Sequence, residues 1–379
     1  MRLVLLGGGH SHIEVLRRLP DFARSTRVTL VSPASLTPYS GMLPGAIAGH
    51  YTIHDSHIDL DGLACAAGAR FVRACATRID AARQCVLLDD GESIDYDVLS
   101  LDIGSTSSAS RVAGAEEIAL DMKPAGGILE RSAALLSRVA SGEVRDISVI
   151  GAGAAGIEVL LALHRRGLTA SVPQTPSLRF TLHDAGMHIL PGYPSRARKV
   201  VSRILCERSI DVRLGDGIAR IEACGLLSTR GQWFPADAIV WTGGPAAPPL
   251  LADSGLALDP SGFVAVNSGL QSTSHSSVFA AGDCASVIGH AYPKSGVYAV
   301  RQGPVLAQNL ECALARKADL IEFRGQRRAL SIITCGERYA VAAYGPVAAE
   351  GRWVWRWKDR IDRKFVARYR IAARSSTRA

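Results

Sequence analysis

The chain has 379 residues, of which 47% are hydrophobic and 21% are charged. This length supports two or three domains with sizeable cores, and the composition excludes a disordered protein. No apolar run approaches the roughly 20 residues that a membrane-spanning helix needs. The first six residues are typical of a strand rather than of a signal peptide. We therefore expect a cytoplasmic protein.

The eight cysteines form no C-x-x-C pair and no His/Cys cluster with zinc spacing. In a cytoplasmic enzyme, scattered cysteines of this kind serve as small hydrophobic residues. We expect no metal site.

A glycine-rich turn follows the first apolar segment. Residues 3–6 predict a short buried strand, and apolar residues recur with helical spacing from Ile13 to Leu19. The turn between them reads Gly7-Gly8-Gly9-His10-Ser11-His12. In such a strand–turn–helix unit, backbone N–H groups and the helix N-terminus face a pyrophosphate. We expect a dinucleotide to contact Gly7, Gly9, His10, Ser11 and His12.

A second unit of the same kind begins at residue 147. The apolar residues 147–150 lead into Gly151-Ala152-Gly153-Ala154-Ala155-Gly156, which has all three glycines of the GxGxxG pattern. Two such units, far apart in one chain, predict two dinucleotides. We expect the second one to contact Gly151, Gly153, Ala154, Ala155 and Gly156.

A Gly-Asp pair ends a third buried segment. Residues 277–281 predict a strand, and Gly282 and Asp283 follow it. An Asp at the carboxyl end of a strand can accept a hydrogen bond from a ribityl hydroxyl, while the glycine lets the backbone approach a pyrophosphate. One of the two dinucleotides is therefore predicted to be tightly bound FAD.

These elements resemble the two-dinucleotide-binding-domain flavoproteins, the pyridine nucleotide–disulfide oxidoreductase superfamily, over residues 1–310. The resemblance implies an α/β fold with two Rossmann-like domains. It divides the chain into a discontinuous FAD domain at 1–118 and 241–310, an inserted NAD(P)H domain at 119–240, and a small C-terminal α+β region at 311–379. Two runs ending in glycine, 96–105 and 236–244, match the family's crossings between domains. They imply FAD contacts from Gly104 and Ser105 and an NAD contact from Gly243.

Within the superfamily, the chain is most similar to three groups. They are the flavoprotein module fused to selenide, water dikinase, the type II NADH dehydrogenases and the sulfide:quinone oxidoreductases. Residues 37–45 match the stretch that passes the isoalloxazine ring in relatives, which implies contacts from Ser40, Gly41 and Met42. Most relatives have an acidic residue at the end of the second strand, where it holds the adenosine ribose. This chain has Ser32 at that position, followed by Pro33, and we expect both residues to contact FAD. His12 replaces the third glycine of the first turn, so we expect the first helix to sit slightly differently.

The resemblance also implies a preference for NADH. Asp184 falls at the ribose position of the second unit, where a carboxylate accepts from a 2′-hydroxyl and repels a 2′-phosphate. Arg196 and Arg198 lie downstream and weaken the discrimination against NADPH. Glu158 matches a position that approaches the nicotinamide in relatives, and its alternative role is a solvated helix surface.

The segment after the Gly-Asp pair carries the candidate catalytic residue. Pro293-Lys294-Ser295-Gly296 resembles the Pro-Lys-Thr-Gly of sulfide:quinone oxidoreductases, whereas Val297 stands where type II NADH dehydrogenases have Gln. A helix beginning here would point its N-terminus at the flavin and stabilise negative charge on it. We therefore expect Ser295, Gly296 and Val297 at the FAD. Lys294 is the candidate anchor for an acceptor carbonyl, and its alternative is a solvated lysine.

Together these patterns predict an FAD-dependent oxidoreductase that takes hydride from NAD(P)H and passes electrons to a quinone-type acceptor. One alternative is a sulfide- or selenide-type quinone oxidoreductase, for which Cys335 is a candidate thiol without a convincing partner. Another is a non-catalytic flavin redox sensor or assembly subunit. The missing C-x-x-C pair disfavours a disulfide reductase.

The C-terminal residues 351–379 carry ten basic and two acidic residues, which accounts for the whole formal net charge of +8. Five apolar residues recur there at every fourth position, namely Trp353, Trp357, Ile361, Phe365 and Tyr369. On a helix this pattern suits an anionic membrane surface, which predicts a peripheral protein on the inner face of the cell membrane. The alternative is a tail folded onto the body or onto a second subunit of a homodimer, with Trp353 and Trp355 on opposite faces of a strand. We expect no nucleic-acid partner.

Overall fold

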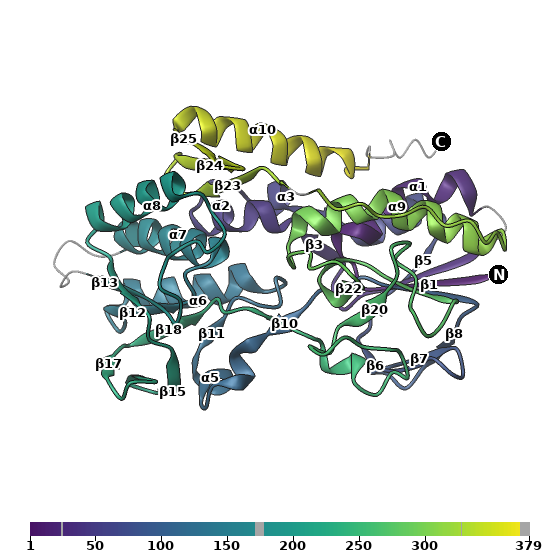
Figure 1. The fold of residues 1–379 in the computed structure, drawn as a ribbon, viewed down its shortest axis with the longest axis horizontal. Coiled ribbons are helices and arrows are strands. Elements are labelled where there is room, and N and C mark those ends of the chain that lie inside the picture. The colour runs from purple at the N-terminus through teal and green to yellow at the C-terminus, as the bar shows by residue number, and fades with distance from the viewer. Residues whose placement is uncertain (24–25, 171–177, 327, 372–379) are drawn as a thin grey trace, which may run out of the picture.

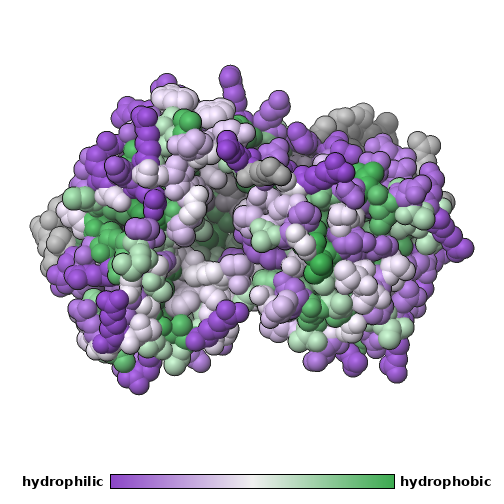
Figure 2. Space-filling model, viewed as in Figure 1, coloured by the Kyte–Doolittle hydropathy of each residue, from purple (hydrophilic) through white to green (hydrophobic). Residues whose placement is uncertain are grey.

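The structure is a computed structural model that describes residues 1–23, 26–170, 178–326 and 328–371. Two α/β units lie side by side, and a C-terminal unit lies across both of them (Figure 1). The outer surface is hollowed between the two halves (Figure 2). This is the mixed α/β arrangement that the two glycine-rich turns predict.

The first unit is built on a parallel five-stranded sheet with the order β21-β9-β1-β2-β5. The apolar residues 3–6 are buried on both faces of the sheet, as expected for parallel strands. The strands of this sheet are β1 (Arg2–Leu6), β2 (Arg27–Val31), β5 (Arg70–Val72), β9 (Val98–Leu101) and β21 (Val278–Ala280). Its main helices are α1 (His10–Phe22), α4 (Leu60–Ala66) and α9 (Gly296–Leu314).

The second unit repeats this plan with the strand order β11-β18-β12-β13-β14, again all parallel. Its strands are β11 (Leu120–Asp121), β12 (Asp146–Ile150), β13 (Arg179–Asp184), β14 (Asp211–Leu214) and β18 (Ala238–Trp241). Its helices are α6 (Ile128–Ala140), α7 (Ala154–Ala170) and α8 (Ser195–Glu207). Strands of the first sheet thus precede and follow the second sheet in the chain. The expected boundaries at 118/119 and 240/241 remain predictions, the second of which falls inside β18.

Each unit also carries a three-stranded antiparallel sheet. These are β6 (Ala76–Asp80), β7 (Cys85–Leu88) and β8 (Ser93–Asp95) in the first, and β15 (Ile218–Glu222), β16 (Gly225–Ser228) and β17 (Trp233–Pro235) in the second. The two chain crossings pair with each other as β10 (Thr106–Ser107) and β19 (Pro245–Ala246). The smaller elements are β3 (Leu36–Pro38), η1 (Ser40–Met42), α2 (Leu43–Ile47), α3 (Ile53–Ser56), β4 (His57–Asp59), η2 (Ser108–Arg111), α5 (Ala115–Ile118), η3 (Pro249–Leu251), β20 (Val264–Val266), η4 (Gly282–Cys284) and β22 (Ala285–Val287).

The C-terminal unit joins the two cores. It consists of the antiparallel strands β23 (Ser331–Thr334), β24 (Ala340–Tyr344) and β25 (Val347–Gly351), followed by α10 (Arg352–Arg368). Ile333 and Val341 pack into the core of the second unit, whereas Phe365 and Val366 pack into the core of the first. Residues 352–368 are therefore a helix, and the alternative of Trp353 and Trp355 on a strand is wrong.

None of the helices in the described part of the chain combines the length and the hydrophobicity that crossing a bilayer requires.

Candidate dinucleotide and acceptor sites

The turn between β1 and α1 requires glycine at its first position. Gly7 has a φ of +96°, and an added Cβ would lie 2.4 Å from the carbonyl oxygen of Asp102. The Gly7 N–H donates to Val31 O at 2.8 Å, which ties the turn to the end of β2. A side chain at this position would therefore both strain the backbone and break the contact with β9.

The turn between β12 and α7 is built in the same way. Gly151 has a φ of +114°, and its N–H donates to His183 O at 2.8 Å. A Cβ on Gly156 would lie only 1.8 Å from Gly151 O. Asp102 N donates to Leu6 O and Thr242 N donates to Ile150 O, each at 2.9 Å. Asp102 and Thr242 therefore hold equivalent places behind the two turns.

Behind the first turn, Asp102 replaces the threonine of the second. Its side chain is buried, and its Oδ2 accepts from the N–H groups of Ser11 at 2.7 Å and His12 at 3.0 Å. Burial raises the pKa of this carboxyl to about 7, against the lowering effect of the two N–H donors. The sequence analysis did not single out Asp102, although it lies in the apolar run before Gly104.

In the first turn, His12 occupies the position of the third glycine. Its ring is fully buried, with Nδ1 2.6 Å from Gly7 O and Nε2 2.8 Å from Ser100 Oγ. Because a carbonyl oxygen only accepts, Nδ1 carries the proton and Ser100 donates to Nε2. Burial lowers the pKa of His12 to about 4, so the ring is neutral at physiological pH. The histidine thus supports the turn by hydrogen bonds where a glycine supports it by close packing.

His10 lies at the start of α1 among aromatic side chains. Its ring is 5.6 Å from that of Tyr39 and 6.3 Å from that of Phe365, and its Nε2 accepts from Ser40 N at 3.4 Å. Burial lowers the pKa of His10 to about 4. These contacts bring the first turn, the 39–42 segment and α10 together around one site.

Gly282 and Asp283 lie at the end of β21, next to the first turn. Gly282 has a φ of +70°, and its N–H donates to Gln302 Oε1 at 2.6 Å. Asp283 accepts from Ser105 Oγ at 3.1 Å and lies 3.6 Å from Lys123 Nζ. Lys123 also donates to Ser105 Oγ at 2.6 Å. The sequence analysis missed Lys123, which comes from the crossing into the second unit.

The N-terminus of α9 meets the 39–42 segment, as a flavin site requires. A Cβ on Gly296 would lie 2.6 Å from Ser40 Oγ, so only glycine permits this approach. The N-cap residue Ser295 makes no side-chain capping bond, and Val297 in the first turn is 40% exposed. A cavity of about 250 Å³ lies between this helix start and Gly282–Asp283. The positive end of the α9 dipole is thus available to a ligand.

Lys294 lines this cavity and is half-buried. Its Nζ donates to Ala285 O and lies 4.0 Å from the centre of the Phe263 ring. Burial lowers the pKa of Lys294. The alternative of a solvated lysine is therefore wrong for this side chain, and its two contacts give it a structural role in the conformation described.

Other expected FAD residues have defined surroundings. Ser32 is buried and donates from Oγ to Ala34 O at 3.1 Å, whereas Pro33 is exposed. Met42 is fully buried, and Gly104 has a φ of +72° with open space around it.

At the second turn, the Asp184 carboxylate lies against the elbow. Its Oδ2 accepts from Ala152 N and its Oδ1 from Gly186 N, both at 2.6 Å. An added Cβ on Gly153 would meet nothing within 4 Å, so a ligand can approach the backbone there. Gly243 contacts the Trp241 ring, which would clash with a Cβ.

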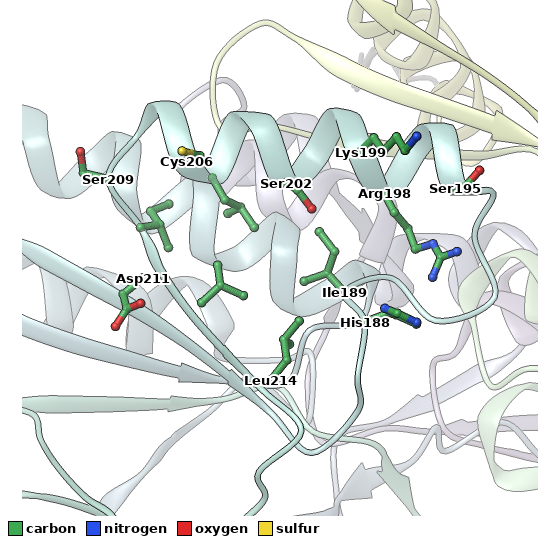
Figure 3. A pocket seen from close by; sticks show the side chains of 13 residues that line it. His188, Ile189, Ser195, Arg198, Lys199, Ser202, Cys206, Ser209, Asp211 and Leu214 are labelled. Atoms are coloured by element: carbon green, nitrogen blue, oxygen red, sulfur yellow. The ribbon is translucent and has the colours of Figure 1, made fainter.

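A separate pocket of about 770 Å³ lies under α8 (Figure 3). Its apolar lining includes Ile189, Leu205 and Leu214. Arg198 and His188 lie together at one end. The glycines of the second turn do not line it. We therefore assign no cofactor to this pocket.

Glu158 is neither on a solvated surface nor unpaired. Its Oε1 accepts from Thr334 N at 2.8 Å and Thr334 Oγ1 at 2.9 Å, so α7 is joined to β23. Burial raises the pKa of Glu158, and the positive charge of Lys358 partly opposes this shift. The alternative of a solvated surface is wrong, because the C-terminal unit covers this part of α7.

Lys358 reaches the same region from α10. Its Nζ donates to Gly41 O at 2.5 Å and to Asp362 Oδ2 at 2.6 Å. Asp362 also forms a hydrogen bond with Tyr39, and burial raises the pKa of both of these groups. A buried Lys–Asp–Tyr network therefore lies between the expected flavin segment and the C-terminal helix. The sequence analysis counted Lys358 only as one of the ten basic residues of 351–379.

The pyridine nucleotide-disulphide oxidoreductase family model matches residues 1–303. The chain belongs to this family. The NADH dehydrogenase-like protein YutJ of Bacillus subtilis is 27% identical over 294 residues, which cover 76% of this chain and 77% of that protein. The type II NADH:quinone oxidoreductase of Haemophilus influenzae is 30% identical over 149 residues, 38% of this chain and 34% of that protein.

Two solved structures share the fold. The sulfide:quinone oxidoreductase of Aquifex aeolicus has a TM-score of 0.79 at 21% identity, covering 97% of this chain and 91% of that one. NDH2 of Plasmodium falciparum in complex with NADH has a TM-score of 0.79 at 13% identity, covering 97% of each chain. These likenesses extend over the C-terminal unit, which the family match does not include.

Proposed function

We propose that the protein is an FAD-dependent oxidoreductase that takes hydride from NADH and passes electrons to a quinone-type acceptor. The observation that carries the proposal is the pair of equivalent turns at the ends of two parallel sheets, with Gly282–Asp283 beside the first. Relatives named as NADH dehydrogenase-like and as NADH:quinone oxidoreductase support it. The family match supports the same reaction class.

The first turn and its neighbours are suited to hold FAD. Gly7 and Gly282 leave no room for side chains, and the start of α9 offers uncapped N–H groups. Asp283 can accept from a ribityl hydroxyl while Ser105 and Lys123 hold its carboxylate in place. When bound, FAD supplies two-electron chemistry between a hydride donor and a quinone. We retain as FAD residues Gly7, Gly9, His10, Ser11, His12, Ser32, Pro33, Ser40, Gly41, Met42, Gly104, Ser105, Gly282, Asp283, Ser295, Gly296 and Val297.

The second turn is suited to hold NADH. Its open side at Gly153 lets a pyrophosphate approach the backbone, and Asp184 lies where a 2′-phosphate would be repelled. We retain as NAD residues Gly151, Gly153, Ala154, Ala155, Gly156, Glu158, Asp184 and Gly243.

The buried network on α10 is suited to manage protons at the acceptor site. Reduction of a quinone by NADH consumes one proton from solvent in addition to the hydride. Lys358 and Asp362 bind Gly41 and Tyr39 of the 39–42 segment, and Glu158 interacts electrostatically with both Lys358 and Asp362. Burial raises the pKa values of Glu158 and Asp362. A carboxyl with a raised pKa can exchange a proton near neutral pH. To bind an acceptor carbonyl, as the sequence predicts, Lys294 Nζ would have to give up its contacts with Ala285 O and the Phe263 ring.

The structure gives no support to chalcogen chemistry at Cys335. The thiol is fully buried, its Sγ lies 3.8 Å from Ile333 O, and burial raises its pKa to about 12. All eight cysteines are free. A thiol held in its protonated form is a poor nucleophile, so a sulfide-type reaction remains the weaker alternative.

The outer face of α10 is suited to a membrane surface. Trp353, Trp357 and Ile361 are 57%, 41% and 40% exposed, and the two indole rings lie 6.4 Å apart. Arg352, Arg356, Arg360 and Lys364 are exposed along the same helix. Tryptophan beside basic residues favours an anionic headgroup interface. We propose that this face rests on the inner surface of the cell membrane, close to lipid-soluble quinone.

An anaerobic titration tests the proposed function. The purified protein should show an oxidised flavin spectrum that bleaches on addition of NADH and recovers on addition of a short-chain quinone. Bleaching by sulfide but not by NADH would instead identify the chalcogen reaction. A flavin that bleaches without turnover in the presence of quinone would indicate a redox sensor.

A further inference from the structure

Beneath its helix N-terminus, the first turn has an acidic group where the second turn has a threonine. At the second turn, Thr242 Oγ1 donates to Ile150 O and Gly151 O, so the neutral side chain only supports the backbone. At the first turn, the equivalent Asp102 places a carboxylate beneath the N-terminus of α1. That terminus is where a dinucleotide pyrophosphate binds in such folds. An acid therefore lies beneath the helix N-terminus of the first turn, whereas the carboxylate at the second turn, Asp184, comes from the end of the neighbouring strand β13.

The two oxygens of Asp102 have different surroundings. Oδ2 accepts both N–H bonds, from Ser11 and His12. Oδ1 faces the space between the two glycines that border the site: added Cβ atoms would lie 2.3 Å from it on Gly9 and 2.5 Å from it on Gly282. Oδ1 accepts no hydrogen bond among the residues that the structure describes. A proton on Asp102 would therefore reside on Oδ1, on the side of Gly9 and Gly282.

The charged groups around Asp102 do not neutralise it. Asp283 on η4 raises its pKa further, and Asp102 in turn raises the pKa of the buried thiol of Cys284. His10 and His12 on α1 are neutral, since burial lowers the pKa of each to about 4. Gln302 on α9 forms no hydrogen bond with the Asp102 carboxylate among the described residues. Its Oε1 instead accepts from Gly282 N. In the described part of the chain, Asp102 has no ion-pair partner.

We propose that Asp102 binds FAD as the neutral acid, so that one proton is taken up from solvent when FAD binds to the ionised apoprotein. The proposal rests on the FAD site of the proposed function. A pyrophosphate entering this site brings negative charge next to a buried carboxylate, and two buried anions without a cation between them are strongly unfavourable. Protonation removes this repulsion and turns Oδ1 from an acceptor into a donor. The balance is Asp102–COO⁻ plus H⁺ plus FAD giving Asp102–COOH with bound FAD.

Release of FAD from the diluted holoprotein tests this coupling directly. Flavin fluorescence reports the free FAD between pH 6 and pH 8.5, a range in which the phosphates of FAD keep their charge. Above the pKa of Asp102 in the apoprotein, the dissociation constant should rise about tenfold for each pH unit, as linkage of one proton requires. Calorimetry of FAD rebinding in buffers of different ionisation enthalpy should show uptake approaching one proton per FAD at pH 8. A flat pH profile and no proton uptake would overturn the proposal without any variant.

Two variants locate the proton. Asp102→Asn keeps an acceptor for the Ser11 and His12 N–H groups but cannot ionise, so FAD binding should become independent of pH and tighter than in the parent at pH 8.5. Asp184→Asn removes the carboxylate that accepts from Ala152 N at the second turn, and it should keep the parent's slope. The same slope in Asp102→Asn as in the parent would assign the proton to another group. Failure of the parent protein to bind FAD would instead refute the proposed function.

Discussion

Lys358 donates a hydrogen bond to Asp362 at 2.6 Å, one helical turn away on the inner side of α10, and both side chains are at least nine-tenths buried. Charges in such positions lose their hydration, and only their mutual contact and their hydrogen bonds compensate for it. The Gly41 carbonyl and the Tyr39 hydroxyl complete the network. The C-terminal helix is thereby joined to the loop that we expect beside the flavin.

Removal of one partner of this pair should destabilise the protein strongly. Lys358→Met leaves Asp362 buried without its cation, which costs about 3–5 kcal/mol of unfolding free energy. Urea unfolding measures this loss. The double variant Lys358→Met/Asp362→Leu should recover part of it, because no buried charge then remains unpaired. Arg138→Met, which breaks the exposed pair with Glu143, should cost about 1 kcal/mol or less. Equal losses in the two single variants would contradict this account of α10.

The buried Asp102 should also govern how stability changes with pH in the apoprotein. Its folded pKa is raised from 3.8 to about 7, so its contribution to stability is largest below pH 4 and is lost as the pH rises towards 7. Asp102→Asn lacks this dependence. The unfolding free energy of the variant minus that of the parent should therefore increase by about 1.4 kcal/mol per pH unit between pH 4 and 7, and level off above. Urea unfolding at four pH values measures it. A constant difference would show that Asp102 is ionised throughout.

Two glycines of the second turn should differ in their effects, because Gly153 faces open space whereas Gly156 packs against Gly151. Gly153→Ala adds a Cβ where the protein has no atom within 4 Å, so stability should change little while the KM for NADH rises at least about tenfold, roughly 1.4 kcal/mol. Gly156→Ala drives its Cβ into Gly151 O and should reduce stability as well. Gly126→Ala, also in open space but outside the turn, serves as the control for both measurements. An unchanged KM in Gly153→Ala would place the nucleotide elsewhere.

Asp184 should decide between the two nicotinamide nucleotides. Asp184→Ser removes the charge that repels a 2′-phosphate and a strong acceptor for a 2′-hydroxyl. The ratio of kcat/KM for NADH to that for NADPH should fall about tenfold or more, which corresponds to roughly one charged hydrogen bond. Steady-state kinetics with each nucleotide measure the ratio, with Asp211→Ser as a carboxylate control on the neighbouring strand. A parent enzyme that uses both nucleotides equally would refute the assignment.

The sequence predicted the two turns and the Gly-Asp pair because these features are local. A buried strand, a glycine with positive φ and a following helix occupy about a dozen consecutive residues, and the geometry at Gly7 and Gly151 follows directly. Asp102 and Lys123 could not be assigned in this way, since their partners lie on distant segments. Lys358 and Asp362 have the spacing of an ordinary exposed i,i+4 pair. Only the packing of α10 onto the 39–42 loop makes them a buried pair.

The same packing determines how membrane binding has to be tested. The apolar stripe drifts around α10, so that Trp353, Trp357 and Ile361 are exposed whereas Phe365 and Tyr369 are buried. Deleting the helix would expose the cores that Val354, Trp355 and Phe365 help to fill. Substitutions on the outer face alone avoid this damage.

We expect the full chain to sediment with vesicles containing anionic lipid at low salt and to be released at high salt, because basic residues near such a surface contribute about 1 kcal/mol each. Trp353→Ser/Trp357→Ser should weaken this binding, and so should replacing Arg352, Arg356 and Arg360 by Gln. Both variants should keep the parent's flavin content and its activity towards a water-soluble quinone. Arg138→Gln and Glu143→Gln change exposed charges of α6 and the residues after it, and serve as controls. Sedimentation that is unaffected by the outer-face variants would assign any lipid binding to another surface, and no sedimentation of the parent would rule out α10 as a membrane contact.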